Sequence, residues 1–245
     1  NYVSGYHQTV ARTFSGEYKI WGHFTANDGV NSLLVPTPIN SLTYPALTGT
    51  VLKAAIGSYG YSNQQTIVLT TTGLFALSGP GIVLDAAIKS DNVFSKLTIN
   101  GLTNGLPLGV GPAEVKMLFA TYFTLAITTC SGDVWIITKT SAMRGNNSSG
   151  NSRGWYRVIT AESGNPRLTG KVATRGSATA MIALRNDNTI WTWGSQTYLG
   201  DGSGPTKRIA ATQMTAPAAG TIKMVGATSD GTNTSYYVLY TDGSL

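Results

Sequence analysis

Charge, cysteine, histidine and long apolar runs are all scarce in this chain of 245 residues. Only 11% of the residues are charged, against about 25% in an average domain. A single cysteine, Cys130, excludes an internal disulfide framework, and its place in a strand hairpin predicts a buried, inert thiol. No run of about 20 apolar residues predicts a membrane span. Because charged residues are few, we expect the polar surface to consist mainly of Thr, Ser, Asn and Gly.

Catalytic and metal-binding patterns are weak. With two histidines, His7 and His23, and one cysteine, a zinc site would need both histidines together with carboxylates. The acidic residues are mostly isolated, or lie at turns where Asp serves the backbone, so no carboxylate pair suits glycoside hydrolysis. Gly-Pro-Gly at 79–81 lacks the Lys-Ser/Thr of a phosphate loop. We therefore expect no enzyme activity, no metal and no cofactor.

One pattern recurs along the chain: an aliphatic strand, a turn with Gly or Asn, and a second strand that ends near Trp-Gly. Its turn residues are Gly16, Gly73, Gly132, Asn188 and Gly243, at intervals of 57, 59, 56 and 55 residues. A near-constant period of this size indicates stacked supersecondary units. Short runs rich in Val, Ile, Thr and Tyr between Gly, Asn and Asp predict β-hairpins. The prediction is an all-β propeller of four-stranded antiparallel blades, with residues 1–245 forming one domain or fragment of about 4.5 repeats of 55–59 residues.

The repeats carry a family resemblance. Gly5-Tyr-His-Gln-Thr-Val-Ala and Asn186-Asp-Asn-Thr-Ile-Trp-Thr-Trp-Gly resemble the regulator-of-chromosome-condensation repeat, as a divergent bacterial or viral copy. Val51-Leu-Lys-Ala-Ala-Ile-Gly57 is similar to the lead-in of that repeat. The resemblance implies a seven-bladed ring, which at this period takes roughly 400 residues. Three interpretations stay open: the chain is part of a longer polypeptide, it closes a small ring of four or five blades, or neighbouring chains complete its sheet edges.

Two groups of residues are candidates for a binding surface. Tyrosines just before the first long strand of several repeats, on one ring face, suit an arc of amphipathic contacts, with packing between blades as the alternative. A basic segment between Lys139 and Arg175 also contains aromatic residues, although the favoured interpretation of residues 141–154 is an ordinary solvated loop. The candidate residues are Tyr6, Tyr59, Tyr61, Tyr122, Arg153, Trp155, Tyr156 and Arg157.

The functional prediction is a non-catalytic, extracellular recognition module, which uses a propeller face to contact a protein or glycan within a larger surface protein. The alternative is a structural component of a surface filament, adhesin or phage virion appendage, with self-association through exposed sheet edges. Low charge and Thr-rich composition favour an extracellular, cell-surface or virion location. Nucleic acid is a disfavoured partner, because the excess of six positive charges is modest.

Overall fold

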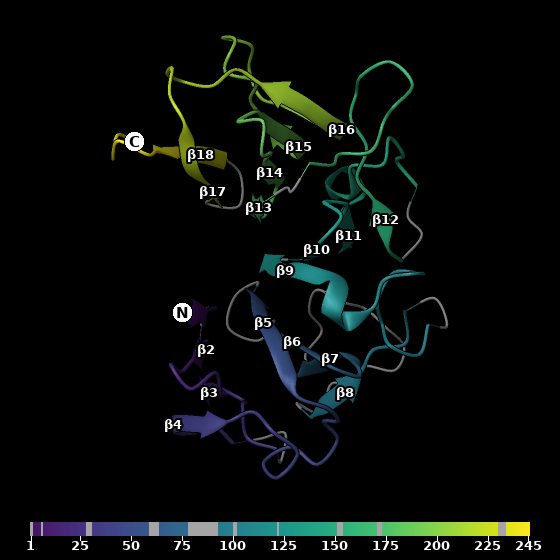
Figure 1. The fold of residues 1–245 in the computed structure, drawn as a ribbon, viewed down its shortest axis with the longest axis vertical. Helices are drawn as coiled ribbons and strands as arrows, with labels where there is room; N and C mark the ends of the chain where they lie inside the picture. The colour runs from purple at the N-terminus through teal and green to yellow at the C-terminus, as the bar shows by residue number, and fades with distance from the viewer. Residues whose placement is uncertain are drawn as a thin grey trace. The chain divides into compact units, whose positions relative to one another are not determined.

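The computed structural model describes residues 2–5, 7–27, 31–58, 64–77, 93–99, 102–121, 123–150, 154–170, 173–229 and 234–245. The described residues form short β-strands with two single-turn 3₁₀ helices, η2 (Pro112–Glu114) and η3 (Ser141–Arg144) (Figure 1). Among these residues no helix has the length and apolarity to cross a membrane.

Four sheets each contain four strands that follow one another along the chain. The first has β1 (Tyr2–Ser4), β2 (Gln8–Arg12), β3 (Tyr18–Gly22) and β4 (Leu33–Pro38), and the second has β5 (Val51–Ser58), β6 (Gln64–Thr70), β7 (Gly73–Leu77) and β8 (Phe94–Lys96). The third has β9 (Val115–Thr121), β10 (Thr124–Thr129), β11 (Val134–Thr138) and β12 (Tyr156–Arg157), and the fourth has β13 (Ala173–Gly176), β14 (Ala180–Leu184), β15 (Ile190–Thr197) and β16 (Thr206–Met214). A two-stranded sheet of β17 (Ile222–Ser229) and β18 (Thr234–Tyr240) comes last. Four-stranded antiparallel meanders of this kind are propeller blades, so the predicted fold class is confirmed.

The predicted turn residues have the backbone conformation that the sequence required. Gly16, Gly73, Gly132, Asn188 and Gly243 have φ values of 92°, 137°, 92°, 67° and 94°. Only Gly, and less readily Asn, adopts such values without strain. The recurrence of one backbone conformation at the predicted period shows that the sequence repeat is a structural repeat.

Four of these turns share one hydrogen-bonding scheme. In the first, the N–H of Thr13 donates to the carbonyl of Glu17 at 2.9 Å, and the N–H of Gly16 donates back to the carbonyl of Thr13 at 3.1 Å. The same two bonds close the turns at Gly132, Asn188 and Gly243. The second blade differs, because β6 and β7 pair directly at Thr70 and Gly73 across a two-residue turn.

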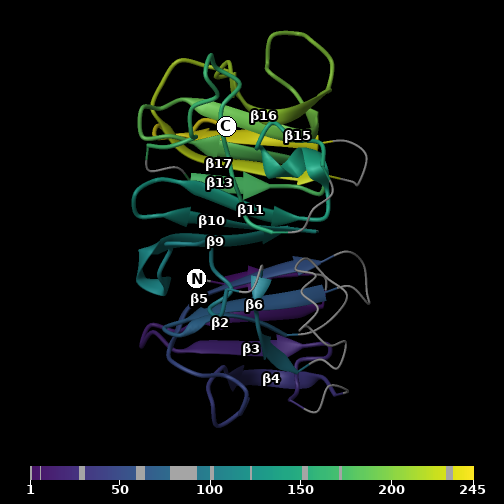
Figure 2. The same ribbon diagram turned by 90° about the vertical axis from the view of Figure 1, so that its right-hand side faces the viewer.

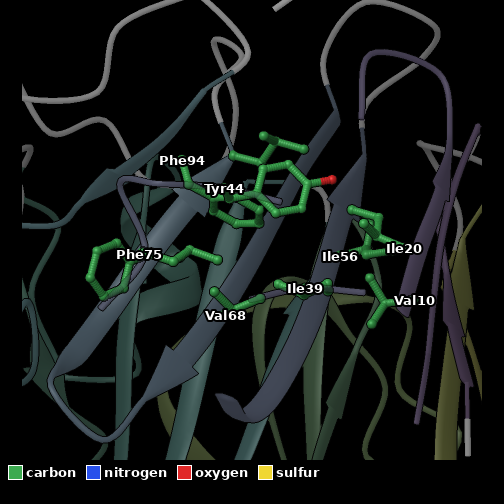
Figure 3. Close-up of a cluster of buried hydrophobic side chains, with 10 residues drawn as sticks. Val10, Ile20, Ile39, Tyr44, Ile56, Val68, Phe75 and Phe94 are labelled. Carbon is green, nitrogen blue, oxygen red and sulfur yellow. The ribbon is translucent and has the colours of Figure 1, made fainter. Parts of the chain in front are cut away.

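The chain divides into two compact units, Asn1–Leu125 and Ala126–Leu245, and the division falls within β10. The core of the first unit is made of β-branched and aromatic side chains from β2, β3 and β5 to β8, together with Ile39, Tyr44 and Leu47 from the loop after β4 (Figure 3). The Tyr44 ring lies edge-on to Phe94, with 4.9 Å between the ring centroids. Its hydroxyl donates to the carbonyl oxygen of Thr25 at 2.5 Å. This core fixes the first two blades against each other.

In the second unit, whose strands Figure 2 draws, hydrophobic side chains from β14, β15 and β16 pack against those of β17 and β18. Trp193 on β15 is fully buried, and its indole N–H donates to the carbonyl of Met143 at 2.9 Å. Met143 belongs to η3, so the loop that follows β11 is anchored to the next blade.

Two local predictions were wrong. Residues 141–154 were expected to form a solvated loop, but Ala142, Met143 and Arg144 are buried, because η3 packs on β15 and β16. Cys130 is exposed, because it occupies the β10–β11 turn and not a strand. The alternation of apolar and polar residues predicts burial only within strands. Residues 141–144 and Cys130 lie outside the strands, so this pattern could not predict their burial.

Candidate binding site

A pocket of about 410 Å³ opens in the first unit between its first two blades and β9. Its volume falls in the range typical of small-ligand and side-chain sites. The lining residues are Tyr2, Val3, Val10, Arg12, Tyr18, Leu52, Lys53, Ala54, Lys116, Met117 and Leu118. The pocket therefore combines an apolar interior with three cationic side chains.

Strand register explains the blade 1 side of this pocket. Val3 on β1 lies opposite Val10 on β2, and Arg12 on β2 lies opposite Tyr18 on β3. Opposite residues of an antiparallel pair point to the same face, as do residues two apart on a strand. Val3, Val10, Arg12 and Tyr18 therefore share one face, and Val10 continues into the buried core.

Tyr18 connects the two blades at the pocket wall. Its hydroxyl donates to the carbonyl of Leu52 on β5 at 2.8 Å, and the Arg12 guanidinium lies 5.9 Å from the centre of its ring. Burial raises the pKa of Tyr18 above its ordinary value, and the positive charge of Arg12 opposes part of that rise. The phenol is thus neutral at pH 7 and remains a hydrogen-bond donor, which keeps this wall in place.

The charges at the pocket are all positive. Arg12, Lys53 and Lys116 contribute cations, and the lining contains no carboxylate. Within the described part of the chain, the ion pairs join Glu17 to Lys19, Asp133 to Arg157, and Asp187 to Arg185, so none neutralises these three cations. Clustered charges of one sign in a cleft with apolar walls concentrate the potential there.

The second and third blades each supply one of the lysines from their first strand. Lys53 is half-buried on β5 and Lys116 is exposed on β9, and the two strands pack side by side. Neither lysine is needed to fill the core, because their neighbours Ala55, Ile56 and Val115 are the buried residues there. The lysines are therefore available for contact with a ligand.

Five of the eight residues predicted for the binding surface, Tyr6, Tyr59, Tyr61, Tyr122 and Arg153, lie outside the described residues. The other three lie in the second unit. Trp155 is 8% exposed, and the ring of Tyr156 lies 4.7 Å from the Arg144 guanidinium. Arg157 stacks over Trp135 at 4.4 Å and lies 3.8 Å from an Asp133 carboxylate oxygen. These three side chains contact their own unit extensively, and they do not line the pocket.

The two histidines lie close together in the first blade. Their ring centroids are 6.0 Å apart, and the N–H of His23 donates to the carbonyl of His7 at 2.8 Å. Across the residues that the structure describes, no three His, Cys, Asp or Glu side chains gather as a metal site would require. The histidine pair is thus placed by the strand pairing of the hairpin.

Sequence analysis missed the pocket because its residues come from three blades that are far apart along the chain. A signal was nevertheless present. A lysine follows the start of the first strand in three described blades, at Lys53, Lys116 and Lys223. A recurring cation at this position, outside the buried core, indicates a surface feature of the repeat.

The four-stranded blades define a fold of the β-propeller class. No family model and no curated protein matches the sequence. Among solved structures, human WBSCR16 aligns with a TM-score of 0.63 and 19% identity over 93% of this chain and 55% of that chain. Prp20p from Saccharomyces cerevisiae, a protein studied for its binding to Gsp1p and histones, aligns with a TM-score of 0.62 and 15% identity over 92% of this chain and 53% of that chain.

These two proteins are β-propellers of the regulator-of-chromosome-condensation type, so the likeness supports the repeat fold that the sequence resembles. The chain spans about half the length of each of these two solved structures. At identities of 19% and 15% the similarity concerns the fold, and function must come from the site.

Proposed function

We propose that the chain is a non-catalytic recognition module that binds a protein partner through the pocket of the first unit. The observation that carries this proposal is the pocket itself: a concavity whose lining combines apolar side chains with three cationic side chains and contains no carboxylate. Strands and a buried core hold the backbone of its walls, so little backbone ordering is needed on binding. Rigid scaffolds of this kind are suited to recognition.

A protein is favoured over a glycan as the partner. Sugars bind best on open aromatic faces, but the Tyr18 ring is half-buried and faces the Arg12 guanidinium. That Prp20p binds Gsp1p and histones adds an analogy between fold and protein recognition. The proposed setting is extracellular, at a bacterial cell surface or on a virion, and low charge and abundant Thr support it.

Peptide selection tests this function. The 245-residue chain is immobilised, and a displayed library of random peptides about 12 residues long is panned against it. We expect enriched peptides that bind the soluble chain with a Kd below about 50 µM, an affinity of roughly 6 kcal/mol. Enrichment no greater than on a blocked surface without the protein would refute the proposed function.

A structural role in an assembly, with pairing at exposed sheet edges, is the second candidate, and low charge and a Thr-rich composition support it. An unpaired edge can accept a strand from another chain. On the edge strand β4, Pro36 and Pro38 limit such pairing. Native mass spectrometry distinguishes the roles, because an assembly component forms oligomers and a recognition module stays monomeric at micromolar concentration.

A further inference from the structure

The electrostatics of the pocket indicate the kind of protein segment that fits it. Arg12, Lys53 and Lys116 line the pocket together with the apolar side chains of Val3, Val10, Leu52 and Ala54. A ligand that carries carboxylates beside an aliphatic group would satisfy both parts. We propose that the pocket binds an acidic segment of a protein, in which two or more Asp or Glu side chains flank a Leu-sized apolar side chain. This inference rests on the proposed function, and it specifies the partner's chemistry.

The three cations differ in what they offer a carboxylate. Arg12 lies near the Tyr18 ring and presents a planar guanidinium, which suits bidentate contact with a carboxylate. The lysine on β5 is half-buried and the lysine on β9 is exposed, so the two side chains differ in how far the protein shields them from water. A carboxylate held between such groups loses less solvation than one in an apolar cavity, because the pocket remains open to water.

An acidic peptide fits better than a nucleic acid. Nucleic-acid surfaces neutralise many phosphates along a track and stack bases on exposed aromatic rings. Here three cations surround a single concavity, and the Tyr18 hydroxyl is already committed to Leu52. The apolar lining would also remain unfilled by phosphate oxygens, whereas an aliphatic side chain would cover it.

Fluorescence anisotropy tests the inference with a defined probe. The probe is a fluorescein-labelled octapeptide of four Glu, two Leu and two Gly, and its comparison peptide has Gln in place of every Glu. A short single strand of DNA, about 12 nucleotides long, is a third probe. We expect the Glu probe to bind at least about 10-fold more tightly than the Gln peptide and the DNA at about 50 mM salt. That preference should weaken as salt rises, since these charges are partly exposed.

Matched charge reversals separate the pocket from net charge. Lys116→Glu and Lys207→Glu both replace an exposed lysine, and both lower the formal net charge of +6 by the same two units. We expect Lys116→Glu to weaken binding of the Glu probe about 10-fold or more, and Lys207→Glu to weaken it less than about 2-fold. Lys53→Ala should also weaken it, with unchanged thermal unfolding confirming that the variant folds.

Each contrary result overturns a different statement. Equal weakening by the two reversals would show binding by net charge and would overturn the pocket assignment. Preference for the DNA probe, lost in Lys116→Glu, would replace the acidic peptide with a nucleic acid. Failure of all three probes, alongside selected peptides that are not acidic and still bind Lys116→Glu, would overturn this inference and leave the proposed protein-binding function intact. If neither probes nor selected peptides bind, both fail.

Discussion

The buried hydroxyl of Tyr44 gives a prediction whose size follows from the structure. The Tyr44 side chain, which Figure 3 labels, has no exposed surface. Its hydroxyl donates to the carbonyl of Thr25. Tyr44→Phe keeps the ring contact with Phe94 but leaves that buried carbonyl without this donor. Loss of one partner of a buried hydrogen bond costs about 1–2 kcal/mol. We expect the free energy of unfolding at pH 8 to fall by that amount.

The pH dependence of this effect has a defined sign. Burial raises the pKa of Tyr44 well above its ordinary value, so the folded state keeps the phenol neutral when the unfolded chain ionises. The contribution of a raised pKa is fully present below the unfolded value of about 10 and is lost as pH rises above it. At pH 11 this loss is about 1.4 kcal/mol for one tyrosine. The difference between wild type and Tyr44→Phe should therefore shrink towards zero between pH 8 and pH 11.

Urea denaturation followed by circular dichroism at the two pH values measures both quantities. Tyr2→Phe is the matched control, because it removes the same hydroxyl from a side chain that is 77% exposed. A difference between wild type and Tyr44→Phe that stays constant from pH 8 to pH 11 would refute the linkage. No loss of stability at pH 8 would refute the hydrogen-bond assignment.

Three further predictions use the same denaturation assay. Arg144→Ala should lower the free energy of unfolding by about 2–4 kcal/mol, because Arg144 is 2% exposed and covers the ring of Tyr156. Arg167→Ala, at an exposed position, should lower it by less than about 0.5 kcal/mol. Equal effects of the two substitutions would contradict this packing. Gly22→Ala should lower the free energy of unfolding by at least about 2 kcal/mol more than Gly243→Ala does. Both glycines have positive φ, but only at Gly22 would a Cβ collide with backbone atoms. A reversed order would contradict the strand register. Arg157→Gln should lower the free energy of unfolding by about 1 kcal/mol, because it removes the contact with Trp135 and Asp133. The affinity for the Glu probe should stay within about 2-fold of the wild-type value. A large loss of affinity would place the binding site in the second unit.

The fold was predictable from the sequence because local backbone requirements repeat along it. Gly16, Gly132 and Gly243 each lie in a turn that follows a strand, and their positive φ is a property of single residues. Periodic turns of this kind can be recognised without knowing any tertiary contact. The exposure of Cys130 was not predicted, because Cys130 directly follows the buried strand β10 and a shift of one residue in the strand boundary decides between burial and exposure.

The pocket could not be predicted in the same way. Arg12, Lys53 and Lys116 belong to three blades, and each taken singly is an ordinary surface cation. Only the packing of β5 beside β1, β2 and β9 brings them together. The sequence favoured the basic segment around Trp155 as a binding surface. In the structure, however, the Arg157 side chain of that segment already stacks on Trp135 of its own unit. Composition identifies basic and aromatic residues, whereas only the fold shows whether they already contact one another.

Zero-length crosslinking tests the central claim most directly. A water-soluble carbodiimide joins a carboxylate to a lysine amine only where the two groups are in contact, so it records where the Glu probe binds. After digestion and mass spectrometry, we expect crosslinks from the probe at Lys53 and Lys116, and their loss in about 500 mM salt. Crosslinks spread equally over exposed lysines such as Lys207 and Lys223 would contradict a binding site in the pocket.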